Sequence, residues 1–368
     1  MNKKKILFIL HIPPPVHGSS IVGKQIMDSK LINSSFNTEY INLGTSKNVS
    51  DIGGMNLKKI STYFRILFTL LKKVIRNKYD LVYIAPTVSN LGFYKDFMAI
   101  VIIKTFQKKS VFHLHNKGVA DRKQNFFSDF CYRFAFSDVD VILLSKLLYN
   151  DVHEFVSEEK IHICPNGIEL IPDLEIKLTN KHKNIVPTIL FLSNLIESKG
   201  VLVLLKSCKI LSEKKIKFKC LFVGGEGDVF KDDFNEKVRK YNLSDRAFYL
   251  GKKYGKDKHE VFLNADIFAF PTFYKNETFG LVNIEAMQYS IPVISTAEGG
   301  IPDIVKNGVN GYIIQKNNSL ELADKLINLI QDEQLRIELG NNGRAKFLNE
   351  YTLDQFEKTL LNILIKLT

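Results

Sequence analysis

The chain has 368 residues, of which 45% are hydrophobic and 24% are charged, and its formal net charge is +12. This length predicts two domains, and the composition is that of a globular protein, which excludes a disordered chain. No apolar run reaches the roughly 18 residues of a membrane-spanning helix, and the apolar stretch near the start is too short for a signal peptide. The four cysteines show no CxxC spacing, so we expect reduced core residues in a cytoplasmic protein.

Short apolar runs alternate with longer helical patterns through the first half of the chain. The first run, residues 5–10, is followed by a loop rich in Pro and Gly, and further runs come at residues 81–84, 111–114, 139–144 and 161–164. Apolar runs of this length between helical patterns are typical of buried parallel strands. We therefore expect βαβ units and a doubly wound sheet.

Residues 56–78 predict a basic amphipathic helix. Seven cations lie in this segment, and its apolar side chains recur at helical spacing: Ile60, Phe64, Leu67, Leu71 and Ile75. Such a helix can pack on the sheet with a solvated basic face, or it can dock on an anionic membrane surface. Because most of the net positive charge falls in residues 1–184, we expect the membrane surface. No nucleic-acid-binding motif accompanies this charge, so no nucleic-acid partner is expected.

A polar stretch at residues 173–187 predicts a linker, after which the alternation of strands and helices restarts. Strands are expected at residues 188–193, 218–223, 247–250, 267–269 and 293–295. We predict a first α/β domain at residues 1–178 and a second at residues 187–350. A C-terminal helix at residues 351–368 is expected to pack back on the first domain.

The strongest chemical pattern is NETFGLVNIEA at residues 276–286. Gly280 lies where a helix is expected to begin, so the backbone N–H groups of Phe279, Gly280 and Leu281 can present an anion site. Glu277 and Glu285 flank this point, and carboxylates accept hydrogen bonds from a ligand rich in hydroxyls. The alternative is an ordinary helix whose glutamates face solvent.

Further segments stand around this pattern in a definite order: SNLIESKG (193–200), GGEGD (224–228), PTFYKNETFG (271–280) and AEGGIPDIVKNGVNGYI (297–313). Together they resemble the retaining glycosyltransferases of family 4. The resemblance is dense over residues 187–348 and weaker over residues 6–168. It implies the α/β GT-B fold, in which two Rossmann-like domains face each other across a cleft.

The resemblance also implies roles for residues of the second domain. Glu277 would lie near the donor sugar hydroxyls, Glu285 would hold the ribose, and Lys199 would neutralise the departing diphosphate, where a fixed cation stabilises the developing charge. The amides of residues 279–281 would meet the diphosphate. Gly224 and Gly225 would lie beside the nucleotide, and Gly299 and Gly300 would line the sugar pocket. For each of these residues there is also a purely structural interpretation: the glycines can form tight turns, and the charged side chains can be solvated.

One position departs from the family pattern. The family has Gly-Arg five residues before the lysine, where this chain has Ser193 and Asn194. Asn194 can donate hydrogen bonds to the donor but carries no charge. We therefore expect a weakened diphosphate site.

Two loops of the first domain carry the remaining candidates. In PVHGS, residues 15–19, the resemblance implies that Gly18 contacts the donor and that His17 and Ser19 lie in the acceptor or sugar pocket. In FHLHNKG, residues 112–118, His113 and His115 share one face of a strand. The resemblance assigns His115 to catalysis beside the donor sugar and Asn116 to the sugar pocket. The alternative of a metal site has no supporting acid or cysteine cluster, so no metal is expected.

The sequence thus predicts a retaining glycosyltransferase that moves a hexose to a glycan or polyprenyl-linked acceptor in cell-surface polysaccharide synthesis. The donor is a nucleoside diphosphate sugar, with a UDP-sugar expected ahead of a GDP-sugar, and no further cofactor is required. We expect the enzyme on the cytoplasmic face of the membrane as a peripheral protein. The alternatives are a catalytically weak GT-B scaffold subunit that binds a partner glycosyltransferase, and a GT-B sugar phosphorylase or hydrolase.

Overall fold

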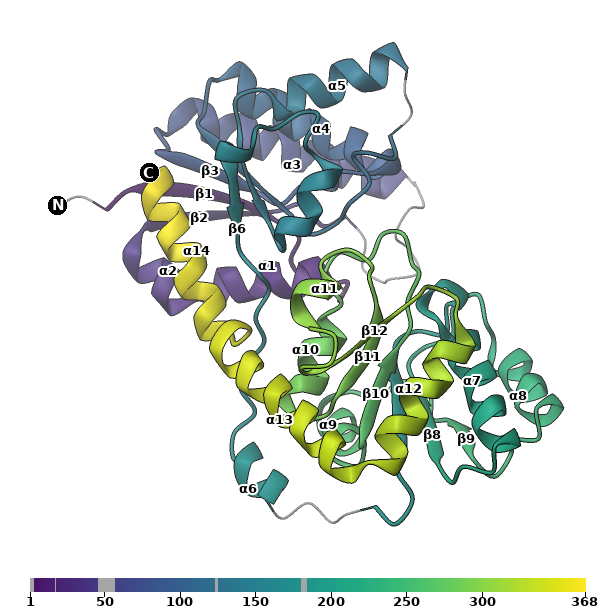
Figure 1. Ribbon diagram of the computed structural model, residues 1–368. Helices are drawn as coiled ribbons and strands as arrows, with labels where there is room; N and C mark the ends of the chain where they lie inside the picture. The colour runs from purple at the N-terminus through teal and green to yellow at the C-terminus, as the bar shows by residue number, and fades with distance from the viewer. Residues whose placement is uncertain (1–2, 17, 46–56, 123–124, 180–183) are drawn as a thin grey trace. The chain divides into compact units, whose positions relative to one another are not determined.

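A computed structural model describes residues 3–16, 18–45, 57–122, 125–179 and 184–368 (Figure 1). The contacts divide the chain into two units. The first comprises the residues up to Gly167 together with Asp354–Thr368, and the second comprises Ile168–Leu353. The chain therefore enters its second unit directly after Gly167, ahead of the polar stretch that we expected to be the linker.

The first unit is built on a parallel six-stranded sheet of order β2-β1-β3-β4-β5-β6. Its strands are β1 (Lys5–Leu10), β2 (Asn37–Asn42), β3 (Leu81–Ile84), β4 (Ser110–Leu114), β5 (Asp140–Leu143) and β6 (Ile161–Ile163). The helices between them are α1 (Gly18–Asp28), α2 (Lys30–Ser35), α3 (Leu57–Arg76), α4 (Asn90–Thr105) and α5 (Phe126–Phe136). The strand order reverses between β1 and β3, so the loops after these strands diverge and leave a crevice at their carboxyl ends.

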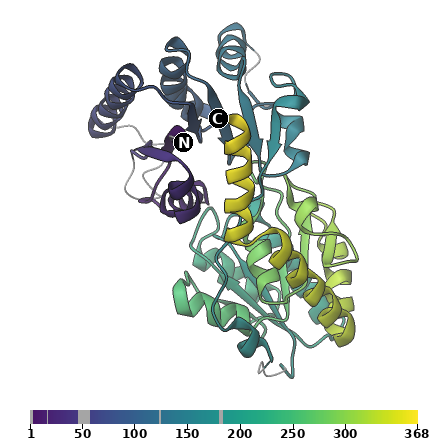
Figure 2. The same cartoon turned by 90° about the vertical axis from the view of Figure 1, so that its left-hand side faces the viewer.

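The last helix, α14 (Leu353–Leu367), is part of the first unit from Asp354 onward (Figure 2). It buries Phe356, Leu360 and Leu364 completely or nearly so. The thiol of Cys164, just after β6, lies 4.0 Å from the carbonyl oxygen of Phe356. The C-terminal segment thereby completes the core of the unit in which the chain begins.

The second unit repeats the architecture with a parallel sheet of order β12-β11-β10-β7-β8-β9. Its strands are β7 (Thr188–Leu192), β8 (Lys219–Val223), β9 (Ala247–Tyr249), β10 (Ile267–Phe270), β11 (Val293–Thr296) and β12 (Gly311–Ile314). Its helices are α6 (Leu174–Thr179), α7 (Val201–Glu213), α8 (Lys231–Lys240), α9 (Gly255–Leu263), α10 (Leu281–Gln288), α11 (Ile301–Ile304), α12 (Ser319–Gln331) and α13 (Glu333–Glu350). The strand order reverses between β7 and β10, which places the crevice of this sheet at the loops that leave those two strands.

The inner strands of both sheets are buried because helices cover both faces, as parallel sheets require, whereas the edge strands are only partly buried. Phe8 and Tyr83 lie at the centre of the first sheet, and Phe191, Phe222 and Phe268 lie at the centre of the second. The predicted α/β class with two doubly wound sheets is confirmed.

Helix α3 corrects one expectation. Its buried side is formed by Leu67, Leu70 and Val74, whereas Ile60, Phe64, Phe68 and Ile75 are exposed. The sequence holds two apolar stripes at helical spacing, and the predicted apolar face combines residues of both. This face included Ile60, Phe64 and Ile75, which do not pack on the sheet.

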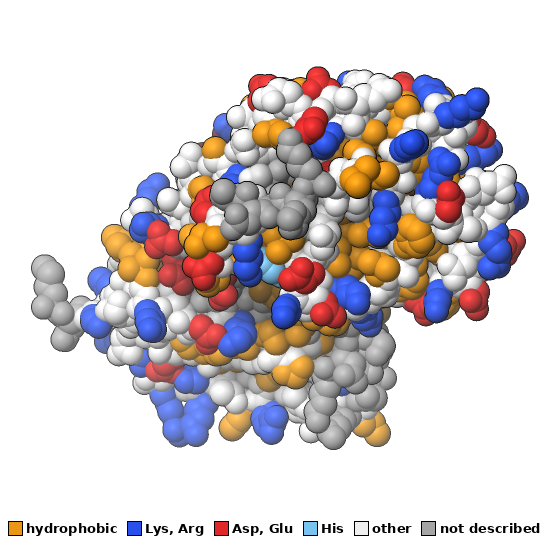
Figure 3. All heavy atoms as spheres, turned by 90° about the horizontal axis from the view of Figure 1, so that it is seen from below, with side chains coloured by type: hydrophobic (Ala, Val, Ile, Leu, Met, Phe, Trp, Pro, Cys, Tyr) orange, Lys and Arg blue, Asp and Glu red, His pale blue; other side chains and the backbone are white. Residues whose placement is uncertain are grey.

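Charges of both signs are interspersed on the molecular face seen in Figure 3. This face has no large patch of charges of one sign, so the net charge of +12 is not concentrated there.

Candidate functional site

Lys199 and Glu277 meet at the crevice of the second sheet. Lys199 ends a short 3₁₀ helix after β7, and Glu277 lies in the loop after β10. The Lys199 Nζ atom is 2.5 Å from Glu277 Oε2, and both side chains are more than four-fifths buried. The ammonium group also lies 4.4 Å from the ring centroid of Tyr274, which adds a cation–π contact. Two residues assigned to catalysis from the sequence are therefore in direct contact.

The amino end of α10 carries part of the predicted anion site. Gly280 has φ +71°, a left-handed conformation that favours glycine, and its N–H donates to Glu277 Oε1 over 3.1 Å. In the described part of the chain, the N–H groups of Phe279 and Leu281 meet no acceptor. We had expected three open amides here, but the amide of Gly280 is already occupied by the side chain of Glu277.

Asn283, in the first turn of α10, was not singled out from the sequence. Its side chain is fully buried, and neither its Oδ1 nor its Nδ2 atom has a hydrogen-bond partner among the residues described. Buried amides without a partner are rare and mark a place for water or a ligand hydroxyl. Gln288 is a second buried amide of this helix, but its side chain is hydrogen-bonded to residues 169 and 171.

Glu285 lies apart from the contact between Lys199 and Glu277. Its Oε1 atom accepts from Lys258 Nζ over 2.7 Å, and its Oε2 atom is buried without a partner among the described residues. It lines a cavity of about 490 Å³ between α9, α10 and residues 168–177, together with Lys258, His259 and Tyr289. Each predicted carboxylate is thus paired with a different lysine, and the sequence analysis had missed Lys258.

The Gly224-Gly225 turn follows β8. The N–H of Gly224 donates to the carbonyl of Gly251 over 2.9 Å, and the N–H of Gly225 donates to Asn194 Oδ1 over 3.0 Å. Both glycine amides are therefore used within the protein and are not open to a donor. Because its oxygen faces Gly225, the exposed side chain of Asn194 keeps only its Nδ2 group as a free donor.

Gly299 and Gly300 pack against the backbone that carries Glu277. The N–H of Gly300 donates to the carbonyl of Thr278 over 2.7 Å, and a Cβ atom at Gly299 would come within 2.3 Å of the carbonyl oxygen of Glu277. Close approach of two backbones explains the glycine at position 299. The two glycines hold the loop of Glu277 in place, and their role in a sugar pocket stays a prediction.

In the first unit, His115 directly follows β4. Its ring centroid is 4.1 Å from that of His113, whose Nδ1 atom bonds the hydroxyl of Tyr83. Burial and the nearby charge of His11 lower the pKa of His115 to about 3. The imidazole of His115 is therefore neutral at neutral pH and can exchange hydrogen bonds but supplies no positive charge.

The remaining candidate residues of the first unit lie in or next to loops. Asn116 Oδ1 accepts from the N–H of Val88, and its Nδ2 group donates to Ser89 Oγ, each over 3.4 Å. Gly18 and Ser19 open α1, and His17 lies outside the described residues.

Two further carboxylates, the buried Asp96 and the partly exposed Asp151, hold these loops. Asp96 Oδ2 accepts from the N–H of Thr87 over 2.9 Å and lies 3.6 Å from His11 Nε2. Asp151 accepts from the N–H groups of residues 118–120, which begin two positions after Asn116, over 2.9 to 3.2 Å. The described residues contain no group of three or more His, Cys, Asp or Glu side chains that could hold a metal ion.

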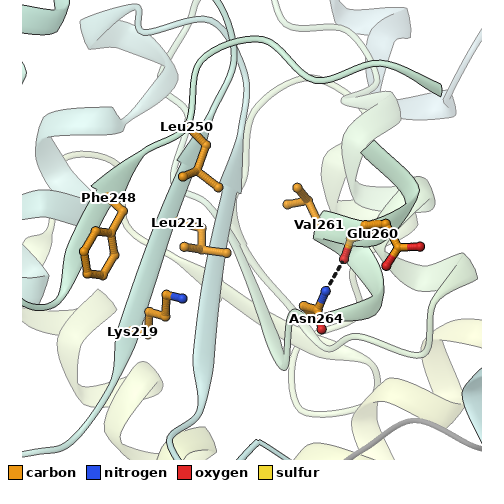
Figure 4. A pocket seen from close by; sticks show the side chains of 7 residues that line it. All are labelled: Lys219, Leu221, Phe248, Leu250, Glu260, Val261 and Asn264. Carbon is orange, nitrogen blue, oxygen red and sulfur yellow. Dashed lines mark hydrogen bonds between the residues drawn. The ribbon is translucent and has the colours of Figure 1, made fainter. Parts of the chain in front are cut away.

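A second cavity, of about 350 Å³, is separate from these groups (Figure 4). It lies between β8, β9 and α9, and its lining is mainly apolar, with Leu221, Phe248, Leu250 and Val261 pointing into it. None of the residues predicted from the sequence lines it, so it is not the candidate site.

Comparison with known proteins is consistent with this geometry. Residues 175–346 match the family of glycosyl transferases group 1. The capsular polysaccharide biosynthesis glycosyltransferase CapM of Staphylococcus aureus is 29% identical over 59% of this chain and 59% of its own length. The chain matches between 59% and 62% of the length of the first curated relatives.

Two solved structures show the fold of the whole chain. A glycosyltransferase from Rickettsia africae superposes with a TM-score of 0.77 at 20% identity, covering 100% of this chain and 99% of the other. Anabaena HepE in complex with UDP and glucose superposes with a TM-score of 0.72 at 18% identity, covering 98% of this chain and 99% of the other.

Proposed function

We propose that this chain, whose residues 175–346 form a glycosyl transferases group 1 domain and whose two units have the GT-B fold, is a glycosyltransferase that uses a nucleoside diphosphate sugar. The observation that carries the proposal is the contact between Lys199 and Glu277 beside the open amides of Phe279 and Leu281. A cation and free N–H groups suit a diphosphate, and a carboxylate beside them suits sugar hydroxyls. The UDP bound in HepE favours a UDP-sugar as the donor ahead of a GDP-sugar.

The proposed reaction is the transfer of a hexose with retention of anomeric configuration. The bond between the sugar C1 atom and the diphosphate oxygen breaks, and a bond from the acceptor oxygen to C1 forms on the same face. The acceptor proton passes to the departing phosphate, so the route needs neither a covalent nucleophile nor a cofactor. Lys199, the Asn194 amide and the N–H groups of Phe279 and Leu281 would stabilise the negative charge that grows on the leaving group.

The first unit would supply the acceptor side. We place His115 beside the donor sugar as a neutral hydrogen-bonding group and Gly18 against the donor, with Asn116 and Ser19 in the acceptor or sugar pocket. Exclusion of water from the bound donor would limit its hydrolysis. The sequence similarity to CapM supports a glycan or polyprenyl-linked acceptor in cell-surface polysaccharide synthesis.

Helix α3 supports docking on an anionic membrane surface at the cytoplasmic face. Four large apolar side chains on its outer side are strongly exposed: Leu57 at 86%, Phe64 at 65%, Phe68 at 69% and Ile75 at 59%. The helix contains no acidic residue, and cations lie beside the exposed stripe at Arg65, Lys72 and Arg76. Apolar insertion and attraction to anionic lipids would act on the same face. No helix among the described residues is long and apolar enough to cross a bilayer.

The donor is tested by a thermal-shift panel of UDP, GDP, ADP, CMP and NAD with the purified full chain. A ligand at about 100 times its Kd stabilises the folded state by about 2.7 kcal/mol, and we expect this stabilisation with UDP. If no nucleoside diphosphate raises the unfolding temperature, the proposed donor site is contradicted. That result would favour the alternative of a catalytically weak scaffold subunit. Incubation of a UDP-sugar with water, phosphate or a glycan acceptor then separates a transferase from a hydrolase or phosphorylase by its products.

A further inference from the structure

We propose that Lys252 supplies the second cation of the diphosphate site, in place of the positive charge that Asn194 lacks. This inference rests on the proposed function, since it concerns the same donor site. Lys252 lies in the loop between β9 and α9, which contains no recognisable sequence motif.

The geometry brings Lys252 to the turn that Asn194 holds. Strands β8 and β9 are neighbours, and the N–H of Gly224 donates to the carbonyl of Gly251, the residue before Lys252, over 2.9 Å. A Cβ atom at Gly225 would lie 2.4 Å from Lys252 Cε, 3.4 Å from Lys252 Nζ and 3.1 Å from Asn194 Oδ1. The lysine side chain therefore lies directly over Gly225, beside the side chain of Asn194, and the absence of a Cβ atom at Gly225 leaves room for it.

Three other lysines near this edge of the sheet are already paired with carboxylates. Lys199 is neutralised by Glu277 at 2.5 Å, Lys258 by Glu285 at 2.7 Å, and Lys253 faces Asp257 at 3.7 Å. Lys252 is exposed, and within the described ranges it has neither an ion-pair nor a hydrogen-bond partner. An ammonium group without a counter-ion, next to the free Nδ2 donor of Asn194, is suited to an incoming phosphate group.

The expected result follows from the charge of the ligand. Lys252→Gln keeps most of the side chain but removes the charge, so the affinity for UDP should fall about tenfold or more, while the affinity for uridine stays unchanged. Lys253→Gln, at the neighbouring and already paired lysine, is the matched control and should leave both affinities unchanged. Isothermal titration calorimetry with UDP and with uridine measures both constants on the full chain.

A rescue variant makes the test specific. In Lys252→Gln, the additional change Asn194→Arg places a cation at the neighbouring position and should restore most of the lost UDP affinity. Equal UDP affinity in Lys252→Gln and the parent would overturn the inference, as would an equal loss for UDP and uridine. Failure of the parent protein to bind UDP or any other nucleoside diphosphate would instead overturn the proposed function itself.

Discussion

Lys199 Nζ lies 2.5 Å from Glu277 Oε2, although the two residues are 78 positions apart in the chain. The contact joins the loops after β7 and β10, the two strands between which the order of the second sheet reverses. The same carboxylate binds the N–H of Gly280 through its other oxygen over 3.1 Å. Glu277 therefore partly neutralises the charge of Lys199 and also occupies the N–H of Gly280.

Opposite effects on diphosphate binding are expected from the two halves of this pair. Lys199→Met leaves the Glu277 carboxylate unopposed, so UDP affinity should fall about tenfold or more and sugar transfer should fall with it. Glu277→Gln releases the charge of Lys199, so UDP affinity should stay at the parent level or rise, while transfer falls about a hundredfold. Calorimetry measures the UDP affinity of each variant, and a transfer assay measures its activity. Equal losses of UDP affinity in both variants would contradict it.

Glu285 is expected to recognise the ribose through its Oε2 atom, because Lys258 occupies Oε1 and Oε2 has no partner in the described part of the chain. The parent protein should prefer UDP over 2′-deoxy-UDP by about tenfold or more, and Glu285→Gln should reduce this preference. Glu260→Gln, at an exposed glutamate on α9, is the control. If Glu285→Ala changes neither donor affinity nor transfer, the ribose assignment is wrong.

The stability of the fold should fall in acid because of His115. Its pKa is about 3 in the folded state, where burial and the charge of His11 lower it, and about 6.5 in an unfolded chain. Between these values the unfolded chain binds a proton that the folded chain does not bind. The free energy of unfolding therefore decreases as the pH falls through this window, by about 1.4 kcal/mol per pH unit well below pH 6.5.

This dependence is measured by urea unfolding at several pH values. Burial also lowers the pKa of His113 well below its usual value, so its contribution has the same sign. His115→Gln should flatten the slope by about one proton, whereas His153→Gln, at an exposed histidine, should not. An unchanged slope in His115→Gln would show that the ring is not buried in its neutral form.

Membrane docking through α3 predicts a loss of vesicle binding on removal of its exposed aromatic side chains. The double variant Phe64→Ser and Phe68→Ser should bind vesicles containing phosphatidylglycerol about tenfold or more weakly, because two rings no longer enter the lipid. Leu320→Ser removes a side chain that is 67% exposed on α12 and is the control.

The cationic side chains of α3 allow a second test of membrane docking. Lys72 and Arg76 are exposed, whereas Lys73 pairs with Glu39 and is a poorer choice for substitution. Replacing Arg65, Lys72 and Arg76 by Gln should weaken binding to anionic but not to neutral vesicles. Undiminished binding in both the aromatic and the charge variants would refute docking through this helix.

Asn283 should show opposite effects on stability and activity. Replacement by Leu removes two buried polar atoms that lack partners among the described residues, so the unliganded protein should become more stable by about 1 kcal/mol. If the amide serves a donor hydroxyl, the same variant should lose transfer activity. A destabilised Asn283→Leu variant with full activity would indicate instead that the amide is satisfied by water.

Much of this architecture can be derived from periodicity alone. Apolar runs such as residues 5–10 and 188–193 alternate with helical patterns, and only a parallel sheet covered on both faces buries such runs completely. The order of NETFGLVNIEA and its flanking segments carries the resemblance that assigns roles to Glu277, Glu285 and Lys199, whereas an anion site at a helix start follows from adjacent residues alone.

The pairings within the site were decided by tertiary structure. The sequence determined which residue types are present, but the strand order decided that Lys199 meets Glu277, that Lys258 meets Glu285 and that Lys252 lies over Gly225. In α3, periodicity showed two apolar stripes, and only packing against the sheet decided that Leu67, Leu70 and Val74 are the buried side. The physical reason is the same in each case: spacing along the chain defines the faces of one element, whereas the contact between two elements depends on how the whole sheet is ordered.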